Sequence, residues 1–165
     1  MLTLFRNTLY LRLQADRLRA LHLESDKPLD EPPVLALRNA AKGPRVPLAA
    51  GHKALALQGQ AGVELANGFR HPRTLLADFA VAEQTLRRLL NRLQPPALLR
   101  PAPTVVLQPL EQLDGGLTQV EIRALVELLR SVGARKVYLW IGAELERSEL
   151  EHLQFPAGRG TLLWP

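Results

Sequence analysis

The sequence predicts an α/β protein built on a mixed sheet of five strands flanked by helices. Three observations support this fold class. Residues 8–23 alternate apolar and polar side chains with the period of two that a hairpin shows. Two longer stretches, starting at Leu75 and Thr118, repeat apolar residues at helical spacing, and a short apolar run follows each of them, as a buried strand would. We expect residues 1–165 to form one domain.

The first elements are a hairpin and a third strand. The leucines of 9–13 alternate with polar residues, a short Ala-Asp turn follows, and a second strand returns over 18–23. A loop rich in proline and aspartate leads to a third short strand over 34–37. The glycines and small residues of 40–68 indicate short pieces of structure, so we expect a small subdomain inserted between core elements there.

The second half alternates helices and strands. A helix with an apolar stripe begins at Leu75 and ends at the Pro-Pro pair 95–96. The remaining predicted elements are a buried strand over 104–107, a helix from Thr118 to a C-cap at Gly133, a buried strand over 136–141, a charged helix over 143–152 and a final strand over 161–164. Strand–helix–strand units need right-handed crossovers and a sheet covered by helices.

Composition narrows the possible functions. The chain has no cysteine, which excludes disulfides and thiolate sites, and its four histidines show no metal-ligand spacing, so we expect no metal site. The net charge is +5, but the cations are spread along the chain and aromatic residues are only 5%, so we do not expect nucleic-acid binding. No apolar run reaches the ~18 residues of a membrane span, and the start is not a secretory signal, so we expect a cytoplasmic protein.

Several short segments match, in order, the motifs of one known family. They are D-E-P-P-V-L-A-L-R at 30–38 (N-E-P-S-V-V-A-I-R in the family), Gly51-His52, A-D-F-A-V-A-E at 77–83 (A-D-F-x-V-T-E), R-P-A-P at 100–103 (R-P-S-P), T-Q-V-E-I-R-A at 118–124 (T-Q-V-E-R-R-A-I) and G-A-R-K-V-Y-L at 133–139 (G-A-R-E-V-F-L). The chain therefore resembles the MreB family of bacterial actin-like, rod shape-determining proteins. The resemblance implies the first actin-like ATPase domain, with a ribonuclease-H-like core and residues 40–68 as its small subdomain.

The resemblance is weakest where the family binds nucleotide. The family's first hairpin carries the phosphate loop D-L-G-T-A-N-T, and the matching stretch here is R-L-Q-A-D-R-L at 12–18. Arg12 cannot hold a magnesium ion, and Gln14 places a side chain where the backbone must approach phosphate. The family's E-E-P is replaced within 140–143, and 160–165 resembles the strand before the second phosphate loop. We therefore expect a chain that holds only the first domain, with no ATPase activity, no nucleotide-binding residue and no cofactor.

Glu121 matches the glutamate that assists hydrolysis in the family. It also forms a capping box with Thr118, in which the two side chains satisfy amides at the start of a helix. Since the phosphate loop is replaced, we expect the capping role and assign no catalytic residue.

Two sets of apolar residues are candidates for contacts with partners. If the second domain is missing, the edge near Leu162 and Trp164 would be an exposed interaction site. Leu2, Leu4 and Phe5 could contact a membrane, since some family members have an amphipathic N-terminus; the alternative is a simple lead-in to the first strand. The expected location is then the cytoplasm, and the alternative is a peripheral position at the inner membrane.

The leading hypothesis is a degenerate MreB-like protein that acts as a non-catalytic binding module linked to cell shape. Its partner would be full-length MreB filaments or a second copy of itself, as a homo-oligomer. One alternative is a ribonuclease-H-like enzyme for phosphoryl substrates, but Arg12 occupies its first carboxylate position and the strands at 104–107 and 136–141 have no acidic residue. The other alternative is a stand-alone scaffold with an unrelated partner.

Overall fold

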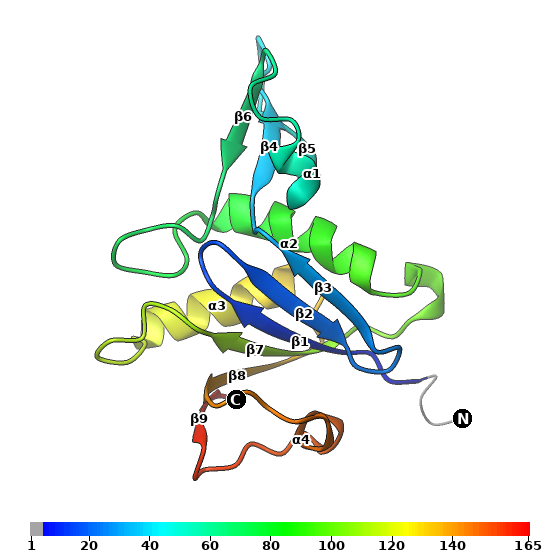
Figure 1. The fold of residues 1–165 in the computed structure, drawn as a ribbon, viewed down its shortest axis with the longest axis vertical. Helices are drawn as coiled ribbons and strands as arrows, with labels where there is room; N and C mark the ends of the chain where they lie inside the picture. The colour runs from blue at the N-terminus through cyan, green and yellow to red at the C-terminus, as the bar shows by residue number, and fades with distance from the viewer. Residues whose placement is uncertain (1–4) are drawn as a thin grey trace.

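A six-stranded mixed sheet forms the base of the molecule in the computed structural model, which describes residues 5–165 (Figure 1). Its strand order is β3-β2-β1-β7-β8-β9, where β1, β7 and β8 are parallel and the other strands are antiparallel to their neighbours. The strands are β1 (Thr8–Leu13), β2 (Leu18–His22), β3 (Lys27–Glu31), β7 (Thr104–Pro109), β8 (Lys136–Gly142) and β9 (Gly160–Trp164). The predicted α/β class with a mixed sheet and flanking helices is confirmed.

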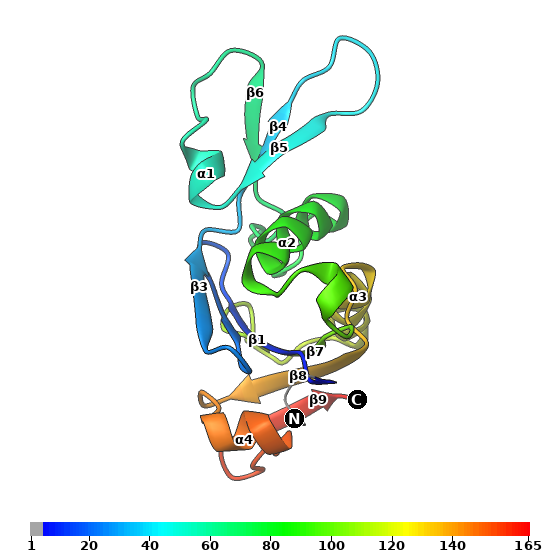
Figure 2. The same cartoon turned by 90° about the vertical axis from the view of Figure 1, so that its right-hand side faces the viewer.

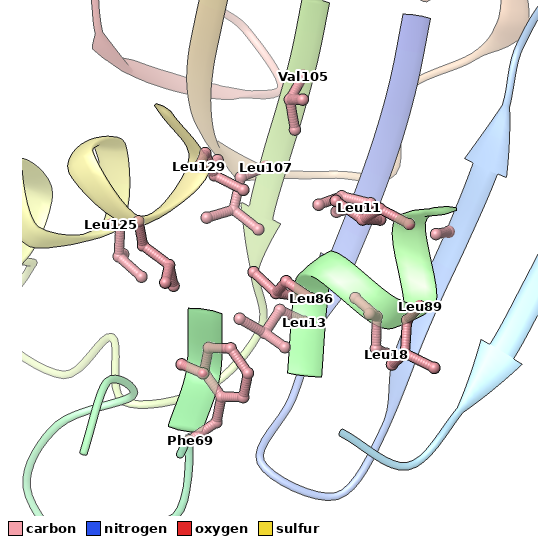
Figure 3. Close-up of a cluster of buried hydrophobic side chains, with 14 of the residues drawn as sticks. Leu11, Leu13, Leu18, Phe69, Leu86, Leu89, Val105, Leu107, Leu125 and Leu129 are labelled. Atoms are coloured by element: carbon pink, nitrogen blue, oxygen red, sulfur yellow. The ribbon is translucent and has the colours of Figure 1, made fainter. Parts of the chain in front are cut away.

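Two helices cover one face of this sheet. They are α2 (Phe79–Leu93) and α3 (Gln119–Ser131), and Figure 2 shows both on the same side of the strands. Asp78 starts α2 by accepting a hydrogen bond from the backbone N–H of Val81 at 3.0 Å. Figure 3 shows leucines of α2 and α3 meeting leucines of β1 and β7, and all are almost fully buried: Leu11, Leu86, Leu89, Leu107, Leu125 and Leu129. The predicted helical stripes therefore point into the main core.

The opposite face of the sheet carries a smaller core. Tyr10, Val106 and Trp140 project from β1, β7 and β8, and the chain segment 143–159 with its short helix α4 (Arg147–His152) packs on them. Phe155 stacks on Tyr138 with ring centroids 5.1 Å apart. The predicted helix over 143–152 begins later than expected. Ala143 instead donates its N–H to the carbonyl of Arg159, which keeps the start of this segment extended.

The C-terminal strand joins the core sheet as a sixth strand. The sheet was predicted to have five strands, and the predicted final strand over 161–164 is β9. In the structure β9 runs antiparallel to β8 and covers what would otherwise be an exposed sheet edge.

A small three-stranded sheet stands above α2 (Figures 1 and 2). It is formed by β4 (Leu35–Arg38), β5 (Val46–Ala50) and β6 (Val63–Ala66) in the order β5-β4-β6, and the short helix α1 (His52–Leu55) follows β5. The strand over 34–37 was predicted to belong to the core sheet, but it is β4 of this small sheet. The core sheet instead uses β3, which lies in a segment that was predicted to be a loop. Pro28 is compatible with β3 because β3 is an edge strand, which tolerates a missing donor. The small sheet thus spans 35–66 and begins before the predicted insertion at 40–68.

Among the described residues, no helix has the length and apolar character needed to cross a membrane.

Candidate functional site

The turn between β1 and β2 lies where the family resemblance places the first phosphate loop. It is a tight hairpin turn, in which Gln14 donates its N–H to the carbonyl of Arg17 at 2.9 Å. Both backbone polar groups of Ala15 are occupied by side chains. The N–H of Ala15 donates to the Glu111 carboxylate at 3.0 Å, and its carbonyl accepts from the Asn67 amide at 2.7 Å. A carboxylate therefore sits at an amide that a phosphate oxygen would need.

Arg12, at the position of the family's metal-binding aspartate, is held by an ion pair. Its Nη1 lies 3.1 Å from the Glu144 carboxylate, and the Arg12 side chain is mostly buried while that of Glu144 is 63% exposed. A cation at this place repels magnesium, whose ligands are oxygen atoms. At this turn a cation therefore stands at the position of the metal ligand, and the amide of Ala15 is already engaged by a carboxylate.

An uncharged hydrogen-bond network beside Arg12 joins the middle of β1 to the ends of β7 and β8. The Tyr10 hydroxyl donates to the side-chain oxygen of Gln108 and accepts from the N–H of Leu145 at 3.1 Å. Gln108 in turn donates to the carbonyl of Gly142 at 2.6 Å. Burial raises the pKa of Tyr10 above its ordinary value. A ribonuclease-H-like enzyme would need carboxylates at these strand ends, and among the described residues no group of three metal-ligating side chains occurs.

Glu121 forms the predicted capping box at the start of α3. The backbone N–H of Thr118 donates to the Glu121 carboxylate at 2.7 Å, and the N–H of Glu121 donates to the Thr118 hydroxyl at 3.2 Å. The Thr118 hydroxyl also donates to the same carboxylate oxygen at 2.9 Å. The carboxylate of Glu121 is thus engaged by its own helix.

Leu162 and Trp164 lie within β9, on opposite faces of the core sheet. Leu162 packs against the smaller core and Trp164 against the main core, so both are half-buried. The guanidinium of Arg130 lies 5.6 Å from the centre of the Trp164 ring. Intramolecular packing therefore uses much of the surface that the sequence singled out for interaction.

Of the three residues proposed to contact a membrane, the structure describes only Phe5. Leu2 and Leu4 lie outside the described residues, and Phe5 is 80% exposed. Two further residues have the same character: Leu98 is 99% and Leu99 is 78% exposed, in the short 3₁₀ helix Ala97–Leu99. Sequence reasoning missed this pair. The signal was available, because prolines at 95, 96 and 101 separate the two leucines from the preceding long helix and the following strand.

Comparisons with known proteins show the family. No protein-family model matches the chain. The cell shape-determining protein MreB of Escherichia coli K12 is 34% identical over 112 residues, which cover 67% of this chain and 31% of that protein. MreB of Haemophilus influenzae is 33% identical over the same extent. The chain is an MreB-like member of the actin family.

Solved structures agree on the fold. MreB5 of Spiroplasma citri bound to ADP superposes with a TM-score of 0.63 and 19% identity, over 82% of this chain and 38% of that one. A non-polymerising mutant of MamK bound to AMPPNP gives a TM-score of 0.64 and 12% identity, over 83% of this chain and 41% of that one. The match to curated MreB proteins spans about a third of their length. The similarity relates this MreB-like chain to cell shape-determining proteins.

Proposed function

We propose that this MreB-like chain is a non-catalytic binding module of the bacterial cytoskeleton, which does not bind magnesium ATP at the β1–β2 turn. The contact between the Ala15 N–H and the Glu111 carboxylate carries the proposal. A phosphate at this turn would have to displace a negatively charged side chain and lie near Glu144, and no metal-holding carboxylate stands at position 12. The fold is kept while the chemistry of the phosphate loop is lost.

Binding of ATP to the purified chain tests the absence of a nucleotide site. Titration calorimetry with ATP, with and without magnesium, should show no magnesium-dependent, adenine-selective binding. The double variant Arg12→Asp/Glu111→Ala removes both obstacles and is the matched comparison. Tight magnesium-dependent ATP binding by the unmodified chain contradicts the proposal.

The partner that the family relationship favours is a filament of full-length MreB or a second copy of the chain. Co-sedimentation with polymerised MreB from the same cell tests the first case, and pelleting should saturate with filament concentration. Sedimentation velocity of the chain alone tests self-association. Two results together contradict both filament binding and self-association: the chain stays monomeric, and it remains in the supernatant when the filaments pellet.

We further propose that the module touches a membrane peripherally. Phe5, Leu98 and Leu99 are exposed apolar side chains, and Arg6 and Arg100 adjoin them in sequence, which suits the apolar and anionic layers of a bilayer surface. Liposome flotation should fall for Phe5→Asp and for Leu98→Asp. Val120→Asp is the matched control, because Val120 is 78% exposed at the start of α3. Equal flotation of the unmodified chain and all three variants contradicts membrane contact.

A further inference from the structure

A cavity separate from the β1–β2 turn lies between α2 and the small sheet. It has a volume of about 370 Å³, which falls within the ~300–1,000 Å³ of small-molecule pockets. Its walls come from β5, from α1 and from α2, and they are formed by Leu48, Ala49, Ala50, Lys53, Arg88, Asn91 and Arg92. The two alanines leave the space open, and Leu48 gives it an apolar side.

Three cations line this cavity. Lys53 comes from α1, and Arg88 and Arg92 lie one turn apart on α2. Among the described residues that line it, none has a carboxylate. Outside the lining, Glu31 is paired with Arg92 at 2.7 Å. Three positive charges with one neutralising partner leave a concave surface with an excess of two, and such a surface concentrates anions.

The contacts that position the two arginines use only some of their N–H donors, so other donors can bind a ligand. Arg88 uses one terminal nitrogen, Nη2, to hold the carbonyl of Pro47 at 2.9 Å, which fixes β5 to α2. Arg92 uses Nη2 for Glu31, and its side chain is 41% exposed. Each guanidinium has five N–H donors, so both retain capacity for a ligand. Lys53 is exposed at the rim and adds a point charge.

We propose that this α2–β5 cavity binds a phosphate group carried by a small molecule. A phosphate monoester has about two negative charges at pH 7 and several acceptor oxygens, which match the charge excess and the guanidinium donors. A single carboxylate of a partner protein supplies one charge and two oxygens, which suits the site less well. Leu48 would contact the non-phosphate part of the ligand. The inference is independent of the proposed function, because no residue of the β1–β2 turn contributes.

Pyrophosphate is the probe that tests the site. Titration calorimetry of the whole chain at low salt, with EDTA present, should show saturable binding at one site that weakens as ionic strength rises. Lys53→Gln should weaken binding about five-fold, and Lys53→Glu should weaken it further. Asn91→Asp gives a second, nearly isosteric variant that places a carboxylate in the cavity, and it should also weaken binding. Lys136→Gln, an exposed charge on β8 outside the cavity, should leave the affinity unchanged.

Thermal unfolding gives a second readout. Pyrophosphate should raise the Tm of the unmodified chain, and the increase should be lost in Lys53→Glu. The proposal is overturned if pyrophosphate shows no saturable binding. It is also overturned if the affinity is unchanged in the Lys53 and Asn91 variants. Lys53-dependent capture of polyglutamate without binding of pyrophosphate also overturns it, in favour of an acidic peptide.

Two further comparisons are needed. One distinguishes a lipid phosphate from a soluble one, and the other distinguishes binding at this cavity from nucleotide binding at the β1–β2 turn. If vesicles containing phosphatidic acid, whose headgroup is a phosphate monoester, bind in a Lys53-dependent way and pyrophosphate competes, the phosphate belongs to a lipid headgroup. If these vesicles do not compete with pyrophosphate, it belongs to a soluble ligand. Binding at the cavity does not need magnesium and does not distinguish adenine. It therefore cannot be mistaken for the nucleotide binding that would contradict the proposed function.

Discussion

The β1–β2 turn and the junction of β3, α1 and α2 are two polar regions of one core domain, and they differ in how their charges are used. At the turn, protein side chains occupy two groups that could meet a ligand: Glu111 accepts from the amide of Ala15, and Glu144 pairs with Arg12. At the junction, one carboxylate, Glu31, joins two elements, and the cations around it exceed what it can neutralise. The turn is closed by internal pairing, whereas the junction leaves positive charge available to a ligand.

Glu31 is the centre of the junction. Its carboxylate accepts from the backbone N–H of His52 at 2.7 Å, lies 2.6 Å from the His52 ring and accepts from Arg92 at 2.7 Å. Burial alone would raise the pKa of Glu31, but the hydrogen bonds from His52 and Arg92 outweigh it and hold the pKa below its ordinary value. These contacts fasten the small sheet to the core, and they connect two of the segments that resemble the MreB family, 30–38 and Gly51-His52.

The largest effect is expected at Gly51. Its φ of 73° and ψ of −144° lie in a region open essentially to glycine, and an added Cβ would come within 2.4 Å of the Glu31 carboxylate. Gly51→Ala should therefore lower the free energy of unfolding in urea by about 2–4 kcal/mol. Gly59→Ala is the control, because Gly59 also has a positive φ but open space around it; a loss of about 1 kcal/mol is expected. Equal losses would mean that Glu31 is not the reason.

Removing the Tyr10 hydroxyl probes the network beside the turn. Tyr10→Phe leaves the N–H of Leu145 and the side chain of Gln108 buried with a partner missing, so the free energy of unfolding should fall by about 1–3 kcal/mol. Tyr138→Phe, on the same face of the sheet, should change it by less than about 0.5 kcal/mol. A neutral Tyr10→Phe variant would show that this network does not stabilise the contact of β1 with β7 and β8.

Glu31→Gln should lower the free energy of unfolding by about 1–2 kcal/mol at neutral pH, since the carboxylate accepts hydrogen bonds from Arg92 and from the His52 backbone, and the Arg92 side chain is itself partly exposed. The effect should depend on pH. The folded-state pKa of Glu31 is depressed, so its contribution is present above the unfolded pKa of about 4.5 and is lost as pH falls through the folded value. The difference between the unmodified chain and Glu31→Gln in urea unfolding should shrink below pH 4.5. A constant difference from pH 7 to pH 3 contradicts the assignment.

The smallest effect is expected at Arg12. Its partner Glu144 is 63% exposed, and such ion pairs contribute little, so Arg12→Gln should change the free energy of unfolding by about 0.5 kcal/mol or less. The same urea measurement checks it. A loss above about 2 kcal/mol would show that Arg12 is a structural residue rather than a replacement that the site tolerates.

Local patterns predicted much of the fold. The alternation over β1 and β2, the stripes of α2 and α3, and the capping box of Thr118 and Glu121 are set by neighbours in the chain, and all are present in the structure. β3 escaped prediction because Pro28 and the charged residues around it look like a loop, and only its place at the sheet edge makes a strand possible. α4 begins late because a contact with Arg159, more than ten residues further on, keeps Ala143 extended.

At the candidate site, the sequence could predict which family residues are replaced, but not which side chains engage the turn. Arg12 and Gln14 can be read against the family's phosphate loop residue by residue. The amide of Ala15, by contrast, is closed by Glu111, which lies 96 residues away, and no spacing rule predicts such a pair. The cations of the α2–β5 cavity come from two elements, α1 and α2, that are far apart in the chain, and they meet only because α1 and α2 both pack on β5.

By itself, the sequence determined the α/β class, the hairpin, the two long helices and the family, since each rests on periodicity or on motifs that are contiguous in the chain. Only the tertiary structure decided which polar groups are paired and which remain available. Pairing depends on side chains that folding brings together across long separations: Glu111 closes the turn, and Lys53, Arg88 and Arg92 converge with too few acids between them.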